Sequence, residues 1–368
     1  MICRAIPRFL KPRLYTEIIK ASSSEYYFNY GRTALSFFLS QYQVYKQKNL
    51  RVGVQAFNCS VVNEAIIHSK NTPVYLDIKL SDYSISSNEI LNKNIDILIV
   101  THYQGIKNID YDKILEICHK NNILIIDDIS QSEFLEFKNT IFKPKRLTLH
   151  SYSFDKPISS LFGGKLKLVS IEEDFEIVFK KKYTMLECES EKTTSLHLRI
   201  LLDLTSICKS DKYTVYFSKT EYIHFLYKIF KTKQNINFII NYSIINKIMF
   251  RVFKKIKFKN EKILRAHDKK VSFIINQKKH SKIDNSCIIF IDKKFPNIIP
   301  KSFLNNDTYI NRLSLIHYND NLIQYLKDKN VEYGNYNWPK LICDDIDKYP
   351  NSLYVSRKII NIPLWKEI

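Results

Sequence analysis

Between residues 50 and 170, the sequence alternates short apolar runs with stretches of helical periodicity. The runs at residues 95–100 and 123–126 are almost continuously apolar, as expected for strands that are buried on both faces. The stretch at residues 111–121 instead places apolar residues three and four positions apart, which is typical of an amphipathic helix. This alternation predicts an α/β fold in which helices cover both faces of a mostly parallel sheet.

The same periodicities divide the remainder of the chain. Further strands are expected at residues 52–56, 73–77 and 147–154, and a helix at residues 61–67. Helical spacing returns at residues 196–207 and 222–230, residues 286–291 and 310–316 suit short strands, and residues 321–329 suit a helix. We therefore expect a large domain over residues 20–250, which holds the covered sheet, and a smaller C-terminal α+β domain over residues 251–368.

The charge of the chain raises the question of a nucleic-acid partner. There are 57 Lys and Arg against 37 Asp and Glu, a formal net charge of +20. The excess is mostly lysine, spread along the whole chain beside abundant isoleucine and asparagine, which is what an AT-rich coding sequence produces. A nucleic-acid surface concentrates Lys and Arg on one element, so we expect no nucleic-acid partner. Residues 239–258 could lie on a membrane surface as a basic helix or pack against the protein, and we favour packing.

Cysteine usage and hydropathy exclude further classes. The seven cysteines are scattered without a C-x-x-C pair, so neither a disulfide framework nor a metal site is predicted. No apolar run approaches the roughly 18 residues of a membrane span. The N-terminus lacks the continuous apolar stretch of a signal peptide, so we expect a cytoplasmic protein.

Candidate functional residues follow the predicted strands. In a mostly parallel sheet, ligands bind beyond the carboxyl ends of the strands. Asp127 and Asp128 come directly after the apolar run 123–126, and Lys156 follows the strand at 147–154. Two of only six glycines stand together at residues 163–164, which indicates a positive φ or a close approach of two backbones. Another, at residue 31, precedes a helical run whose first N–H groups could hold a phosphate.

A phosphate site, a buried acid and a lysine at the ends of one sheet together suggest pyridoxal 5′-phosphate (PLP). This cofactor needs an amine for its Schiff base, an acid that keeps its pyridine nitrogen protonated, and donors for its phosphate. Each feature alone has a plainer explanation, since most lysines are surface residues and aspartates after a strand often cap helices. The joint occurrence of the three features in this order carries the prediction.

The chain resembles the DegT/DnrJ/EryC1/StrS family of sugar aminotransferases. Residues 126–132 resemble the family segment "IEDAAQS", and residues 151–156 with 159–164 resemble its lysine segment. The two are specific as a pair, with Lys156 standing 28 positions after Asp128. Looser matches lie at residues 31–35, 54–62, 73–77, 100–105 and 360–364. The resemblance implies the type I fold of PLP-dependent transferases, with a large domain of mostly parallel covered sheet and a smaller C-terminal α+β domain.

The resemblance also assigns roles around the cofactor ring. Lys156 would bind the cofactor covalently and then move a proton during catalysis. Asp128 would pair with the pyridine nitrogen, with Asp127 as the rival for this role. Gln131 would lie against the hydroxyl side of the ring. Cys59 stands near the position where many family members place an aromatic ring over the cofactor.

The resemblance places the phosphate at the start of the first long helix. Ser151 would donate a hydrogen bond to the phosphate. The backbone N–H groups of Arg32 and Thr33 would join it. Phe57 is the aromatic residue that could take the stacking position instead of Cys59.

The expected activity is transfer of an amino group from glutamate to a nucleotide-linked keto-sugar, in surface-polysaccharide or lipopolysaccharide-type biosynthesis. We expect a homodimer, as in the family. One alternative is a PLP-dependent sugar dehydratase of the same fold, although such enzymes have histidine where this chain has Lys156. Another is a catalytically silent relative with a regulatory or binding role.

Overall fold

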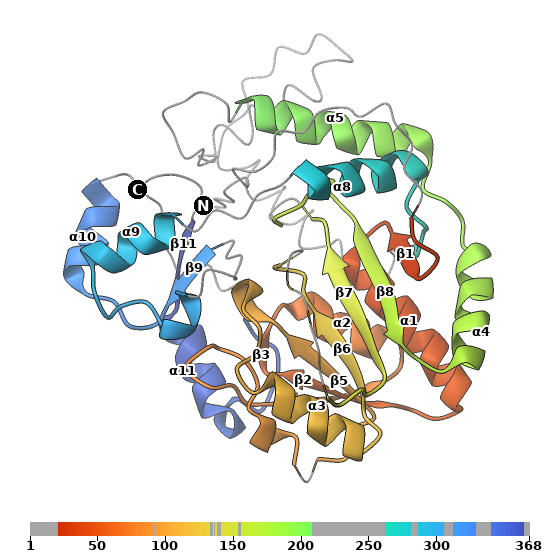
Figure 1. Cartoon of the computed structure of the whole chain (residues 1–368), viewed down its shortest axis with the longest axis horizontal. Coiled ribbons are helices and arrows are strands. Elements are labelled where there is room, and N and C mark those ends of the chain that lie inside the picture. The colour runs from red at the N-terminus through yellow and green to blue at the C-terminus, as the bar shows by residue number, and fades with distance from the viewer. Residues whose placement is uncertain are drawn as a thin grey trace.

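The central feature of the fold is one seven-stranded sheet (Figure 1). The computed structural model describes residues 21–91, 93–132, 135, 137, 141–153, 156–207, 262–280, 286–304, 312–328 and 340–363. The strand order is β1-β8-β7-β6-β5-β2-β4. The strands are β1 (Glu25–Phe28), β2 (Arg51–Gln55), β4 (Thr72–Leu76), β5 (Ile97–Thr101), β6 (Leu124–Asp128), β7 (Arg146–Ser151) and β8 (Gly164–Ser170). Strand β8 runs antiparallel to β1 and β7, whereas all other pairs are parallel.

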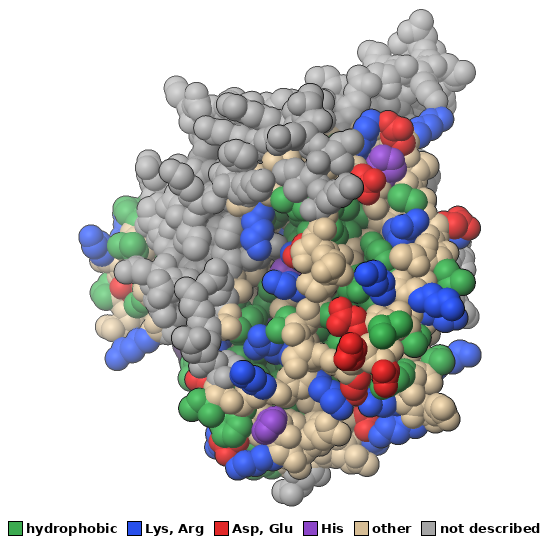
Figure 2. All heavy atoms as spheres, turned by 45° about the vertical axis from the view of Figure 1, so that its right-hand side comes forward, with side chains coloured by type: hydrophobic (Ala, Val, Ile, Leu, Met, Phe, Trp, Pro, Cys, Tyr) green, Lys and Arg blue, Asp and Glu red, His purple; other side chains and the backbone are tan. Residues whose placement is uncertain are grey.

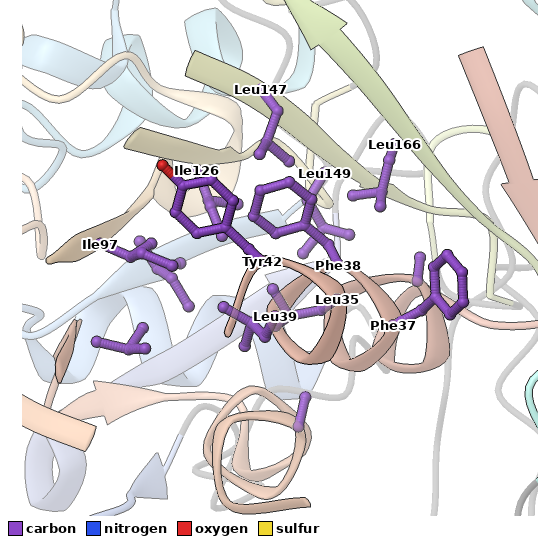
Figure 3. Packing of buried hydrophobic residues seen from close by; sticks show 14 of the residues in the cluster. Leu35, Phe37, Phe38, Leu39, Tyr42, Ile97, Ile126, Leu147, Leu149 and Leu166 are labelled. Atoms are coloured by element: carbon purple, nitrogen blue, oxygen red, sulfur yellow. The ribbon is translucent and has the colours of Figure 1, made fainter. Parts of the chain in front are cut away.

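Helices cover both faces of this sheet because its central strands are apolar on both sides. In β6, Ile126 packs in a cluster with Phe38 of α1 (Gly31–Lys46), as Figure 3 shows. The preceding residue, Ile125, packs on the opposite face in a cluster with residues of α3 (Tyr111–Lys120). Successive side chains of a strand point to opposite faces, so an uninterrupted apolar run needs a cover on each side. The predicted mostly parallel, covered sheet is confirmed.

The other elements complete the large unit and form a second one. They are the helices α2 (Ser60–His68), α4 (Glu173–Thr184), α5 (Glu191–Ile207), α8 (Asp268–His280), α9 (Ser286–Lys294), α10 (Asp320–Asp328) and α11 (Pro350–Lys358). Two-stranded pairs join β3 (Phe57–Asn58) to β10 (Lys340–Leu341) and β9 (Arg312–Leu315) to β11 (Ile360–Pro363). Short 3₁₀ helices lie at Ser87–Glu89, Tyr103–Gly105, Lys301–Phe303 and Ile346–Lys348.

A small unit is built on the β9–β11 pair and lies at the left of Figure 1. Helices α9, α10 and α11 share one apolar cluster with this pair. Phe57 and Tyr103, which follow strands of the large sheet, belong to the same cluster, so the two units share a core. The strand expected at 310–316 and the helix expected at 321–329 correspond to β9 and α10.

One predicted strand, at residues 286–291, is wrong because these residues begin helix α9. Ile288 and Ile291 are buried, whereas Ile289 and Phe290 between them are 45% and 39% exposed. A spacing of three is that of a helix, since a strand would bury alternate residues. Short apolar runs do not distinguish the two, and the neighbouring surface decided here. The stretches 222–230 and 239–258 and the expected domain boundary at residue 250 lie outside the described residues.

Helices α5 and α8 lie side by side and are joined by a buried charged cluster (Figure 1). Lys270 of α8 has no exposed surface, and its Nζ lies 2.5 Å from Oε2 of Glu189, just before α5. Thr194 Oγ1 donates to the same oxygen at 2.9 Å, and His197 Nδ1 lies 3.3 Å from Oε1. Burial by itself raises the pKa of Glu189, but its bonds to His197, Lys270 and Thr194 lower it to about 2.

Two observations concern the surface of the described residues. No described helix is both long and apolar enough to cross a bilayer. On the face shown in Figure 2, Lys and Arg side chains are scattered among acidic and apolar ones rather than gathered into one patch.

Glu189→Gln should flatten the acid side of the stability profile. The folded pKa of about 2 lies below the unfolded value of about 4.3, so the carboxylate contributes stability above about pH 5 that is lost as the pH falls toward 2. Urea unfolding at several pH values between about 7 and 2 should show a smaller loss in the variant. Glu191→Gln breaks the exposed pair with Lys269 on the same two helices and is the control. An equal flattening by both variants would contradict a special role for the buried cluster.

Candidate active site

The residues predicted for a site lie at one edge of the sheet, where the parallel strands have their carboxyl ends. Asp128 ends β6 and Ser151 ends β7. Strand β6 pairs with β7 so that Asp128 stands opposite Leu149, two residues before Ser151. Lys156 lies in the loop from β7 to β8, and Cys59 follows β3 as the N-cap of α2. We call this edge of the large sheet the carboxyl edge.

The start of α1 is held against the carboxyl edge by a contact between two glycines. A Cβ added to Gly164 would lie 2.5 Å from the N and Cα of Gly31, so no other residue fits there. In the described residues, the glycine with a positive φ is Gly105, at 86°. The predicted need at residues 163–164 is therefore a close approach and not a left-handed backbone.

This contact places Ser151 beside the first turn of α1. A Cβ on Gly31 would lie 3.3 Å from Ser151 Cβ and 3.4 Å from Ser151 Oγ. Gly164 stands opposite Ser151 in β7 and opposite Phe28 in β1, so three strands converge here. The first N–H groups of an α-helix lack intrahelical acceptors, and a hydroxyl beside them completes a site suited to an anion.

Arg32 and Thr33 belong to this first turn, and their side chains face other partners. Thr33 Oγ1 accepts from the N–H of Tyr30 at 3.2 Å and donates to Asn29 Oδ1 at 2.8 Å. The hydroxyl is thereby used in capping the helix. The Arg32 guanidinium lies over the ring of Tyr30, 4.4 Å from its centroid.

The carboxylate of Asp127 is held by side chains of the core. It has no exposed surface, and its Oδ1 and Oδ2 lie 2.8 and 2.9 Å from the hydroxyl of Tyr111 in α3. His102 Nε2 lies 3.1 Å from the same Oδ1, and Arg146 Nε lies 3.6 Å from Oδ2. Burial and the charge of Asp127 raise the pKa of Tyr111, so this hydroxyl remains a donor. His102, which follows β5, is thus part of a buried structural network.

Asp128 faces the other side of the sheet. Because strand residues alternate, it shares the face of Ile126 and α1, whereas Asp127 shares the face of Ile125 and α3. Its Oδ1 accepts a hydrogen bond from the backbone N–H of Ser130 at 3.0 Å. A carboxylate has about four acceptor positions, so this bond leaves capacity for a further donor.

The loop that carries Lys156 is held by α8. Lys156 is 7% exposed, and its backbone N–H donates to Ser153 O at 3.0 Å. Gln277 of α8 donates through Nε2 to Ser159 O at 2.8 Å, and the N–H of Ser159 donates to Gln277 Oε1 at 3.4 Å. Ile158 packs with apolar residues of α8. Although α8 falls in the range expected for the small domain, it supports the loop of the large one.

Two other buried lysines serve the fold through ion pairs. Lys165 pairs with Glu25 at 3.2 Å, and Lys270 pairs with Glu189 at 2.5 Å. Burying a lysine is unfavourable unless its charge is compensated. Neither of these lysines comes from the loop that follows β7 at the carboxyl edge.

Cys59 and Phe57 differ in their surroundings, since Cys59 is partly buried and Phe57 is fully buried. The N–H of Cys59 donates to Asn58 Oδ1 at 2.7 Å, and Asn58 Nδ2 donates to Thr101 Oγ1 at 3.1 Å. Asn58, which sequence reasoning missed, therefore ties Cys59 to the end of β5. The Phe57 ring is fully buried in the core shared with the small unit, 5.8 Å from the ring of Tyr103. The Phe57 ring is therefore part of the hydrophobic core.

Gln131 is linked to a second residue that sequence reasoning missed. The backbone N–H of Gln104 donates to Gln131 Oε1 at 2.8 Å. Gln104 belongs to the turn 100–105, which was a family-like motif without a role for this residue. In the described part of the chain, no group of three His, Cys, Asp or Glu is placed to hold a metal ion.

The sequence matches a known family over the segment that carries the site. Residues 28–166 match the sequence model of the DegT/DnrJ/EryC1/StrS aminotransferase family. All residues predicted for the site, from Arg32 to Lys156, lie inside this segment. The predicted resemblance to this family is confirmed over this segment. A comparison with curated proteins gives no match.

Solved structures of similar fold include sugar aminotransferases and a dehydratase. Helicobacter pylori PseC, an aminotransferase of pseudoaminic acid biosynthesis, is 11% identical, with a TM-score of 0.59 and coverage of 98% of this chain and 92% of its own. Spr1654 of Streptococcus pneumoniae, a putative sugar aminotransferase in its PMP form, is 14% identical, with a TM-score of 0.61 and coverage of 99% and 92%. The E. coli GDP-4-keto-6-deoxy-D-mannose-3-dehydratase, solved with hydrated PLP, is 13% identical, with a TM-score of 0.57 and coverage of 92% and 82%. At these identities the likeness establishes the fold, and the predicted type I fold is confirmed.

Gly164→Ala should destabilise the protein by about 2–3 kcal/mol, because the new Cβ meets backbone that cannot rotate away. Gly163→Ala is the matched control, since its Cβ would meet Ser160 Oγ at 2.8 Å, an atom at the end of a rotatable side chain. Its loss should be about 1 kcal/mol in urea unfolding. Equal losses at the two positions would contradict the importance of the contact with Gly31.

Proposed function

We propose that this chain is a PLP-dependent aminotransferase that transfers an amino group from glutamate to a nucleotide-linked keto-sugar. The observation that carries the proposal is the arrangement of the carboxyl edge. The start of α1, Ser151, Asp128 and the loop that carries Lys156 lie at this edge, inside the segment that matches the aminotransferase family, and this supports the proposal.

The phosphate of PLP would occupy the first turn of α1. Gly31 and Gly164 keep side chains away from this turn, and Ser151 Oγ, which lies beside Gly31, would donate to the phosphate. The N–H groups of Arg32 and Thr33 would hold the phosphate oxygens, aided by the partial positive charge of the helix start. The residues present therefore fit an organic phosphate.

Asp128 is the carboxylate we assign to the pyridine nitrogen. It lies on the same face of the sheet as α1, whereas Asp127 is held by Tyr111 and His102 on the opposite face. A carboxylate beside the ring nitrogen would hold a proton there. Gln131, three residues further on, would lie beside the ring hydroxyl.

Lys156 is the residue we assign to proton transfer. PLP, when bound, supplies the electron sink that makes the substrate Cα acidic. The amine of Lys156 would take the proton from the Cα of glutamate and would return a proton to the sugar carbon that receives the amino group. The support of its loop by Gln277 and Ile158 would hold this amine in place and limit the access of water.

The substrate and setting are the finer parts of the proposal. The sugar aminotransferases among the structural neighbours support a sugar acceptor. We propose a role in surface-polysaccharide or lipopolysaccharide-type biosynthesis, in the cytoplasm and as a homodimer. The presence of Lys156, where the dehydratases of this fold have histidine, supports amine transfer over dehydration.

Lys156→Ala should abolish the absorption band that PLP forms with the protein and that borohydride bleaches. Lys165→Ala is the matched control, because Lys165 is also buried but pairs with Glu25, and this variant should keep the band. Glutamate added to the wild type should convert the band and release 2-oxoglutarate. A band that survives in Lys156→Ala would contradict the assignment. A wild-type band that glutamate leaves unchanged would indicate a silent relative.

Substitution of the two neighbouring aspartates should separate cofactor binding from stability. Asp128→Asn should weaken PLP binding about ten- to a hundredfold, as for the loss of a charge-assisted hydrogen bond, with a small effect on unfolding. Asp127→Asn should instead lower the free energy of unfolding by about 2–4 kcal/mol, because it disrupts a buried network. PLP titration and urea unfolding measure the two effects. The reverse pattern would assign the ring nitrogen to Asp127.

A further inference from the structure

Gln104 occupies an unusual position between the carboxyl edge and the small unit. It lies in the 3₁₀ turn Tyr103–Gly105 after β5, is 1% exposed and has a φ of 59°. A left-handed backbone is unfavourable for a residue with a Cβ, so the surrounding structure must hold it there. The contacts of Gln104 show what this conformation achieves.

Gln104 joins residues of the two units through one chain of hydrogen bonds, which is buried on the side of the small unit and partly buried at Gln131. Its backbone N–H donates to Gln131 Oε1 at 2.8 Å, on the side of the large sheet. Its side-chain Nε2 donates to Ser314 Oγ of β9 at 2.8 Å, and this hydroxyl donates to Asn361 Oδ1 of β11 at 2.5 Å. We call Gln131, Gln104, Ser314 and Asn361 the interdomain relay.

The Gln104 side chain serves as a hydrogen-bond donor and not as an acceptor. Its Oε1 is buried without a hydrogen-bond partner among the described residues. Such an atom costs about 1–3 kcal/mol, and a methionine would fill a similar volume without this cost. The amide N–H is therefore the feature that distinguishes glutamine from an apolar residue at this position.

We propose that Gln104 is a positioning residue that couples the Gln131 side chain to the position of the β9–β11 pair. A displacement of the small unit would break the bond at Ser314 or carry Gln104 with it, because breaking this bond leaves buried polar groups unsatisfied. The relay thereby conveys the placement of the small unit to the turn that follows β6. The coupling is independent of the proposed function, whereas its consequence for the cofactor rests on that function through Gln131.

The coupling is tested by hydrogen exchange in the full chain without added PLP. Ser314→Ala and Gln104→Met should each accelerate exchange of the peptide covering residues 126–132 at least threefold, although Ser314 belongs to the other unit. Ser352→Ala is the matched control. It removes an equally buried hydroxyl that also joins the two units, through a 2.6 Å bond from Ser352 Oγ to Asp77 Oδ1 at the end of β4. This control should leave the peptide 126–132 unchanged.

PLP titration of the same variants tests the consequence for the cofactor. Gln104→Met should weaken PLP binding about three- to tenfold, and the double variant with Ser314→Ala should bind no more weakly than the weaker single variant, as expected for links of one chain. Ser352→Ala should bind PLP like the wild type.

The two measurements distinguish failure of the relay from failure of the proposed function. Equal exchange of residues 126–132 in Ser314→Ala, Ser352→Ala and the wild type would overturn the coupling, whatever PLP does. Unchanged PLP affinity in Gln104→Met would overturn its positioning role at the cofactor site. A wild type that forms no PLP band would instead refute the proposed function, and the exchange result would still decide the coupling.

Discussion

The backbone contact between Gly164 and Gly31 determines where the first long helix begins relative to the sheet. Since a Cβ at residue 164 would stand 2.5 Å from the Gly31 backbone, the start of α1 can approach β8 only because Gly164 lacks a side chain. The contact brings Ser151 beside the first turn of α1, where the proposed function places the phosphate of the cofactor. The position of α1 in turn sets the apolar cover of the sheet, which Leu35 and Phe38 provide.

Some buried polar groups of this chain are held by hydrogen bonds and ion pairs within the core, and others lie at the carboxyl edge. Asp127 is held by Tyr111 and His102, and Lys270 is held by Glu189. Asp128, next to Asp127 in the sequence, and Lys156, a buried lysine like Lys270, are the residues that the proposed function assigns to the cofactor. Strand alternation is the reason that two consecutive aspartates take such different environments. One acid on each face of β6 lets the same strand contribute to the core network and to the site.

Much of the large unit was predictable because its strands and helices are long enough to show their periods. The runs that became β5 and β6 and the helical spacing of α3 needed no tertiary information. The short run at residues 286–291 did not show its period, and the surface beneath Ile288 and Ile291 made it helix α9. The family motifs likewise pointed to Asp128 and Lys156. They could not point to Gln104, whose partners at residues 131 and 314 are far away in the sequence.

The sequence by itself determined the covered, mostly parallel sheet and the order of candidate residues along the carboxyl ends of its strands. Both follow from local periodicity and from residue types at strand ends, which are properties of neighbouring residues. Only the tertiary structure decided that Asp127, and not Asp128, is held in the core network. It also decided why Gly164 cannot carry a side chain and how Gln104 contacts Ser314 of β9. These outcomes depend on contacts between distant segments, because burial and hydrogen-bond partners are set by what packs against a residue and not by its own sequence neighbours.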